Sequence, residues 1–126
     1  MKKILNLTQH AATPEQVADG VIEPENKAAV QAALTFETLP TQAEVQERAL
    51  DLSEIARDSG CEAAMVGGAP YLMEPLERCL KSVGVVALYA FSQRESSEQR
   101  QPDGSVRKVQ TFRHAGWVQA RQGREL

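Results

Sequence analysis

Three short polar segments hold the residues of this sequence that could do chemistry. They are Thr8-Gln9-His10, the run 67–71 and the run 92–96. Each follows a stretch of apolar residues that is typical of a buried strand. Ligands of open parallel sheets bind beyond the carboxyl ends of the strands, so three such exits would meet at one rim. We therefore expect these segments to build one shared ligand site.

The pair Gly67-Gly68 is the most specific local feature of the chain. Two glycines let the backbone approach a ligand and adopt positive φ. The helix start that follows offers unpaired N–H groups and a positive dipole end, which favour an anion. No Gly-Lys-Ser/Thr or G-x-G-x-x-G pattern is present, so neither classical nucleotide loop is supported. A tight strand-to-helix turn without a ligand is the alternative, and Tyr71 could stack on a ligand ring or only cover the helix start.

The first segment offers His10 as a candidate catalytic residue and Thr8 as a ligand-binding hydroxyl. An imidazole can give or take a proton near neutral pH, so His10 could act as an acid, a base or a phosphate donor. The alternative is a histidine that caps or braces its own loop.

The third segment offers Arg94 as the second candidate catalytic residue, with Ser92 and Ser96 as ligand-binding hydroxyls on either side. An arginine fork holds a phosphate or carboxylate through paired hydrogen bonds. The alternative is a weak surface ion pair of Arg94 with Glu95 or Glu98.

Other chemistries find no support in the sequence. Neither serine of the third segment lies in a G-x-S-x-G elbow. The two cysteines, Cys61 and Cys79, and the two histidines, His10 and His114, do not make a metal-binding spacing. We therefore expect no metal and no cofactor, and reduced, packed thiols.

The charge balance favours a small anionic ligand over duplex DNA. Formal net charge is −3, yet residues from Arg94 onward carry seven Lys/Arg against four Asp/Glu. This excess is far below the basic footprint of a duplex-binding domain. No apolar run reaches the roughly 18 residues of a membrane span, and the N-terminal apolar stretch is too short for a secretory signal. We expect a cytoplasmic protein that does not contact a membrane.

Hydrophobic periodicity and capping signals predict a single α/β domain over residues 1–126. Its fold class is a small Rossmann-like, mainly parallel sheet flanked by helices, with a C-terminal β-hairpin. Pro75 delays the regular part of the last helix to Glu74. The expected elements are strands 3–7, 61–66 and 85–91, helices 13–20, 24–34, 41–60 and 71–83, a hairpin 95–113 and a frayed tail 120–126.

The segments 4–13, 67–72 and 91–96 resemble small uncharacterised proteins of bacteria and their phages. The likeness covers most of the chain, including the turn at 102–106 and the run 111–114, and it implies no established activity.

More distantly, the polar exit after the first strand and the glycine-containing later exit resemble CARF-type Rossmann-like domains, the sensor modules of CRISPR accessory proteins. Those domains bind cyclic oligoadenylates across a homodimer, and some cleave them without metal. The resemblance implies ligand contacts at five positions of this sequence: Thr8, His10, Gly67, Gly68 and Arg94.

Two hypotheses of function follow. In the first, the protein binds a nucleotide-like or other phosphate-bearing ligand at the rim and cleaves it without metal. His10 would carry a proton, and Arg94 and the Gly67-Gly68 amides would stabilise the developing charge. In the second, it is a non-enzymatic phage or mobile-element protein, an inhibitor or adaptor that binds a protein partner through its hairpin. Both allow a homodimer.

Overall fold

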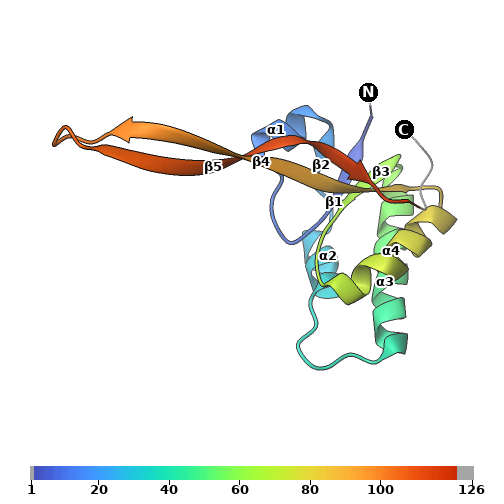
Figure 1. Ribbon diagram of the computed structural model, residues 1–126. Coiled ribbons are helices and arrows are strands. Elements are labelled where there is room, and N and C mark those ends of the chain that lie inside the picture. Colours follow the sequence, from blue (N-terminus) through green and yellow to red (C-terminus); the bar gives the residue numbers. More distant parts are fainter. Residues whose placement is uncertain (1, 122–126) are drawn as a thin grey trace.

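The computed structural model describes residues 2–121. It is an α/β fold with a curled, mostly parallel five-stranded sheet in the order β2-β1-β3-β4-β5 (Figure 1). The elements along the chain are β1 (Ile4–Leu7), α1 (Pro14–Ala18), β2 (Val21–Ile22), α2 (Lys27–Leu34), α3 (Gln42–Ser59), β3 (Ala63–Val66), α4 (Pro70–Ser82), β4 (Val86–Arg100) and β5 (Val106–Gln119).

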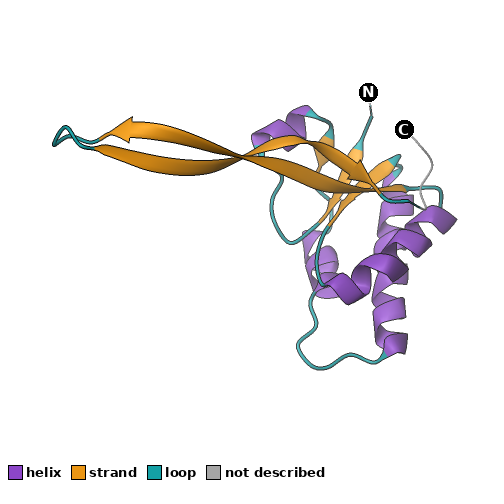
Figure 2. Cartoon of the chain, viewed as in Figure 1, coloured by secondary structure: helices purple, strands orange, loops and turns teal. Residues whose placement is uncertain are grey.

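Helices cover the two faces of the sheet unequally (Figure 2). One face packs α2, α3 and α4 against side chains such as Leu5, Leu7 and Val66. The opposite face carries a smaller cluster around Ile4 and Met65, beside the short α1. Neighbouring residues of β1 and β3 therefore point into different cores, which explains why both strands are buried along their whole length.

Side-chain caps set the helix starts. Thr13 and Gln16 form the expected capping box of α1, and the Thr41 hydroxyl accepts from the Glu44 N–H at α3. Helix α2 begins at Lys27 and not near Pro24, because the Asn26 side chain accepts a hydrogen bond from the Ala29 N–H.

One expectation about regular structure is wrong, and one strand was not expected. The last helix starts at Pro70 and contains Pro75, whose buried ring packs in the core, so the proline does not delay the helix to Glu74. The second strand, β2, has only two residues and pairs in parallel with β1. A strand of that length has no readable periodicity.

The largest departure concerns the third predicted exit. Strand β4 does not end near Phe91 but continues to Arg100, paired antiparallel with β5. The run 92–96 is therefore strand and not loop. The reason lies in the sequence, since no Gly or Pro interrupts it between Phe91 and Gln101. Only the first residues of β4 are buried, and Phe91 is 50% exposed.

The far ends of β4 and β5, residues 92–114, form a hairpin arm that projects from the domain (Figure 1). A register shift at Phe91/Ser92 separates the arm from the paired strands inside the domain. After β5 the chain is still ordered at Ala120, which is buried and donates its N–H to the Ala87 carbonyl at 3.0 Å. The prediction of a frayed tail from residue 120 is therefore wrong at Ala120. Residues 122–126 lie outside the described residues.

Candidate functional site

Two of the three predicted segments meet in one hollow of about 350 Å³. The loop after β1 forms one side and the Gly67-Gly68 turn after β3 forms the other. The lining residues are Thr8, Gln9, His10, Ala11, Thr13, Gln16, Met65, Val66, Gly67, Gly68, Tyr89 and Ala90.

Topology explains why a hollow opens at this place. From β1 the chain turns toward α1 on one face of the sheet, whereas from β3 it turns toward α4 on the other face. The strand order reverses between these two adjacent strands. Such a switch point leaves a crevice outside the carboxyl ends of the strands, where doubly wound sheets bind ligands.

The buried side chain of Asn6 holds the first loop in place. Its Nδ2 donates to the His10 carbonyl at 2.8 Å and to the Glu23 carboxylate at 3.0 Å, and its Oδ1 accepts from the Thr8 N–H and hydroxyl. Glu23 also accepts from the Ala12 N–H at 2.9 Å. Sequence reasoning missed this network, although a polar residue within an apolar strand is the signal that could have found it.

Thr8 and His10 consequently have different roles in the hollow. The Thr8 hydroxyl is within hydrogen-bond reach of the Asn6 side chain and of the His10 backbone. His10 braces the loop through its main chain, while its exposed ring makes no hydrogen bond to any residue in the range 2–121. The imidazole of His10 is thus available to a ligand.

The diglycine turn brings the two exits into contact. A Cβ built at Gly67 would lie 3.5 Å from Cγ2 of Thr8, and Gly68 has φ +152°, which a residue with a side chain rarely adopts. Helix α4 then starts at Pro70 without a side-chain cap from Ala69. The positive end of the α4 dipole is therefore not offset by a capping side chain.

Two tyrosines lie near this region. Tyr71 does not line the hollow; its half-exposed ring packs edge-on against Phe36 with centroids 5.4 Å apart. Tyr89 does line it, and its hydroxyl donates to Glu77 Oε2 at 2.5 Å. Burial, followed by the hydrogen bond to Glu77, raises the pKa of Tyr89. Tyr89 was missed because its position depends on the pairing of β3 with β4.

The predicted residues of the third segment lie outside the hollow. Ser92, Arg94 and Ser96 are exposed on the arm, and Arg94 is four residues beyond Ala90, about 13 Å along an extended strand. The Arg94 guanidinium lies 5.5 Å from the centroid of Phe112. The alternative, an ion pair of Arg94 with Glu95 or Glu98, is not formed either, and Glu95 instead lies 3.6 Å from Arg113.

Comparison with known proteins places this arrangement in a family. A family model matches residues 2–118, which include both exits and nearly all of β5. The chain belongs to the uncharacterised protein MJ1673 family. No curated protein and no solved structure matches it.

In this MJ1673-family chain, the base of the arm is fixed to α1 and its flank. The Arg113 guanidinium contacts Glu15 at 3.4 Å, and His114 Nε2 lies 2.9 Å from the Asp19 carboxylate. The His114 ring also packs against Trp117, with centroids 4.7 Å apart, and its buried Nδ1 has no hydrogen-bond partner among residues 2–121. Neither side chain lines the hollow. Their contacts with Glu15 and Asp19 instead anchor the arm to the body.

The described part of the MJ1673-family chain shows neither a metal-ligand cluster nor a membrane-spanning helix. Within residues 2–121, no group of three or more His, Cys, Asp or Glu side chains is arranged to hold a metal ion. In the same range, none of the helices has the length and apolar character needed to cross a membrane.

Proposed function

We propose that the protein binds a small phosphate-bearing ligand of the nucleotide type in the hollow between the exits of β1 and β3. The observation that carries this proposal is the meeting of two loops, almost 60 residues apart in sequence, around one hollow at the strand-order reversal. Its volume of about 350 Å³ falls within the usual range for small-molecule pockets.

Each wall of the hollow suits a different part of such a ligand. The turn at Gly67-Gly68 favours the phosphate group, because glycines let backbone amides approach an anion closely. Met65 and Ala90 offer apolar surface to a base or sugar.

His10 gives the site a group that could move a proton. In the cleavage that we propose, a ribose 2′-hydroxyl attacks the adjacent phosphorus and passes its proton to the His10 ring. The bond to the leaving oxygen then breaks, and that oxygen takes up a proton, so a cyclic phosphate forms without metal or oxidant. The backbone amides of Gly67 and Gly68, which line the hollow, would stabilise the developing charge, a role first expected of them together with Arg94.

Binding is tested by calorimetry and thermal shift with inorganic phosphate, mononucleotides, dinucleotides and cyclic oligoadenylates. We expect one nucleotide class to raise the melting temperature and Gly68→Val to abolish that rise. Arg94→Ala is the matched control, because Arg94 lies outside the hollow, and it should bind as the parent does. The absence of a shift with every compound, or an equal loss in Arg94→Ala, would refute the proposal.

Cleavage is tested separately with the nucleotide that binds. The exposed ring of His10 can be removed without disturbing the Asn6 network, which uses only the main chain of that residue. We expect His10→Ala to bind normally and to lose at least 100-fold in turnover. Undiminished turnover in His10→Ala would exclude the imidazole as proton carrier.

A further inference from the structure

The hairpin arm lacks the cover that a ribbon of this kind needs. Every residue of β4 from Phe91 to Arg100 is exposed, and on β5 only Val109 and His114 are partly buried between residues 106 and 114. An isolated two-stranded hairpin is marginally stable at best in water. The arm therefore has the form of an element that is completed by another surface.

One face of the arm combines an aromatic side chain with unpaired cations. Residues opposite each other in an antiparallel pair share a face, and here Arg94 is opposite Phe112, Glu98 opposite Lys108 and Arg100 opposite Val106. Phe112 is 69% exposed beneath the Arg94 guanidinium. Within residues 2–121, no carboxylate forms an ion pair with any of the three cations of this face: Arg94, Arg100 and Lys108.

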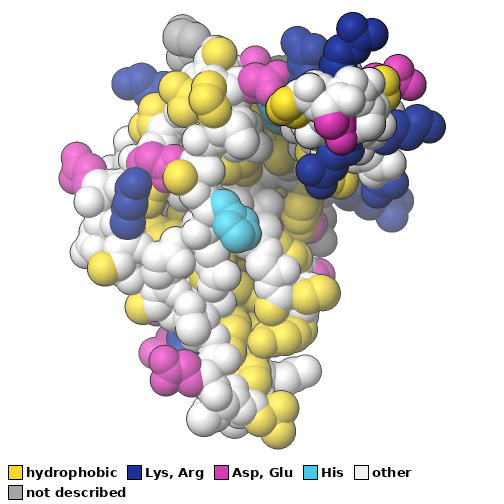
Figure 3. Space-filling view, turned by 90° about the vertical axis from the view of Figure 1, so that its left-hand side faces the viewer, with side chains coloured by type: hydrophobic (Ala, Val, Ile, Leu, Met, Phe, Trp, Pro, Cys, Tyr) yellow, Lys and Arg dark blue, Asp and Glu magenta, His cyan; other side chains and the backbone are white. Residues whose placement is uncertain are grey.

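Figure 3 looks at the arm from its tip and shows Lys and Arg side chains around the projecting end. Exposed aromatic and arginine side chains that lie together are typical of interaction hot spots. We call the face that carries Arg94, Arg100, Val106, Lys108 and Phe112 the arm face.

The body of the same chain carries a complementary groove between α2 and α3. It has a volume of about 510 Å³ and is lined by both apolar and acidic residues. We call its apolar lining the floor (Ala29, Ala32, Ala33 and Ile55) and its acidic lining the rim (Asp51, Glu54 and Asp58); Arg48 also lines it.

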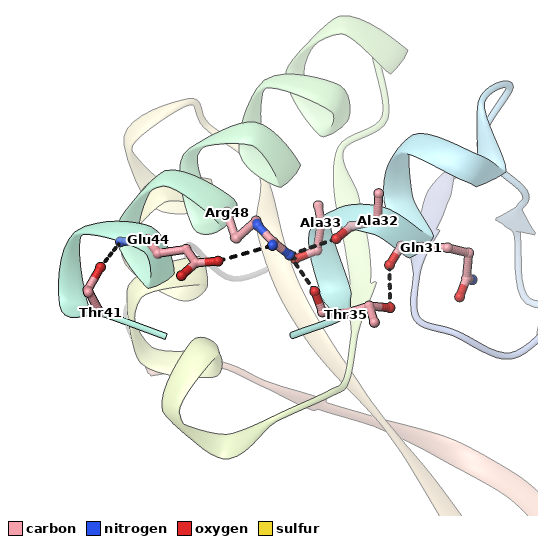
Figure 4. Close-up of polar contacts among 7 residues, drawn as sticks. All are labelled: Gln31, Ala32, Ala33, Thr35, Thr41, Glu44 and Arg48. Atoms are coloured by element: carbon pink, nitrogen blue, oxygen red, sulfur yellow. Dashed lines mark hydrogen bonds and ion pairs between the residues drawn. The ribbon is translucent and has the colours of Figure 1, made fainter. Parts of the chain in front are cut away.

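Arg48 does not neutralise this rim. Figure 4 shows its guanidinium turned toward the end of α2, where it donates to the carbonyls of Ala32 and Thr35 at 2.7 and 2.6 Å and pairs with Glu44. Asp51 and Glu54 form no ion pair with residues of the described range. Asp58 pairs with Arg57 at 3.0 Å, so the uncompensated negative charge of the groove lies at Asp51 and Glu54.

We propose that the arm face docks in the α2–α3 groove of a second copy of this chain. Phe112 would lie on the alanine floor, and the arm cations would pair with Asp51 and Glu54. The arm projects away from its own body, so the groove it fills belongs to the other protomer (Figure 1). With two-fold symmetry each protomer gives one arm and receives one, which doubles the contact. This proposal does not rest on the ligand of the hollow.

Charge exchange between the two surfaces tests the docking with the full-length chain. The arm variant carries Arg94→Glu and Lys108→Glu, and the groove variant carries Asp51→Lys and Glu54→Lys. Light scattering after size exclusion should show a dimer for the parent and a monomer for each variant, with dissociation constants raised at least 10-fold by like-charge contacts.

Mixing the two variants is the decisive step. In a mixed dimer the altered arm meets the altered groove, and the parent arm meets the parent groove, so both contacts regain opposite charges. We expect the mixture to dimerise although neither variant does alone. This rescue also shows that both variants are folded.

Lys3→Glu is the matched control, since it reverses an exposed charge away from both surfaces and should leave the dimer intact. A parent that stays monomeric at every concentration would overturn the proposal, and so would a mixture that stays monomeric. Binding of single- or double-stranded oligonucleotides through the arm by a monomeric parent would instead assign the arm face to nucleic acid.

Discussion

The body and the arm of this protein are built on different physical principles. In the body, β1 and β3 are buried along their whole length, and the buried side chain of Asn6 fixes a whole loop. In the arm, backbone pairing continues through nine residue pairs, in which every residue except Val109 and His114 is exposed. Core packing therefore restricts the residue types of the body. The arm residues are instead suited to contact another molecule.

The largest expected effect is a core truncation in the body. Leu72→Ala removes a side chain with no exposed surface from the α4 core and should lower the free energy of unfolding by about 2–5 kcal/mol. Val106→Ala on the arm should lower it by under about 0.5 kcal/mol at protein concentrations where the chain is monomeric. Denaturant unfolding of both variants at such a concentration checks the contrast, and equal losses would mean that the monomer buries the arm.

Removal of the Asn6 amide comes next. Asn6→Leu leaves the Glu23 carboxylate and the His10 carbonyl without their buried donor, and the expected loss of stability is about 1–3 kcal/mol. The same variant should lose ligand binding, because the loop after β1 is no longer held. Stability that falls while binding persists would show that Thr8 and His10 reach the hollow without this support.

A smaller loss is expected at the diglycine turn. Gly68→Ala must place a side chain at φ +152°, at a cost of about 1 kcal/mol. The added Cβ meets Leu34 and Met73 only at 3.6 Å, so backbone strain and not collision is the cause. Thermal melts compare this variant with Gly60→Ala, which places a side chain at a helix C-cap with φ +75° and open space around it. The difference between the two melting temperatures distinguishes strain at the diglycine turn from strain at an ordinary helix end.

Alkaline pH should weaken the body through Tyr89. Burial and the hydrogen bond to Glu77 raise the pKa of Tyr89 in the folded protein. Its contribution to stability is complete below the ordinary tyrosine pKa of about 10 and is lost as pH rises above it, because the unfolded chain releases the proton first. Denaturation at pH 9 and 11 should therefore show a steeper loss for the parent than for Tyr89→Phe.

The smallest effect is expected at the exposed ion pair that joins arm and body. Arg113 and Glu15 are both largely exposed, so Glu15→Gln should change the free energy of unfolding by less than about 0.5 kcal/mol. A loss above about 1 kcal/mol in denaturant unfolding would show that the arm base contributes to the body core.

The sequence predicts those parts of the fold whose signals are local. The capping residues Thr13 and Thr41 and the terminal Gly60 mark helices α1 and α3 because each acts on its own helix end. The meeting of Thr8 with Gly67 is predicted because parallel strands end on one rim. Arg94 is misplaced because a polar strand without Gly or Pro carries no sign of whether it ends or continues.

The missed residues of the site depend on contacts between distant segments. Asn6 acquires its role from Glu23, which is held by β2, a strand too short to read. Tyr89 faces the hollow only because β4 pairs with β3 in one particular register. Neither relation can be derived from one sequence without the sheet order.

Helix α1 belongs to two neighbourhoods at once. Its cap Thr13 and its Gln16 form part of the wall of the hollow, while Glu15 and Asp19 hold the root of the arm. A ligand in the hollow would therefore contact the same short helix that anchors the arm, so the hollow and the arm share one structural support.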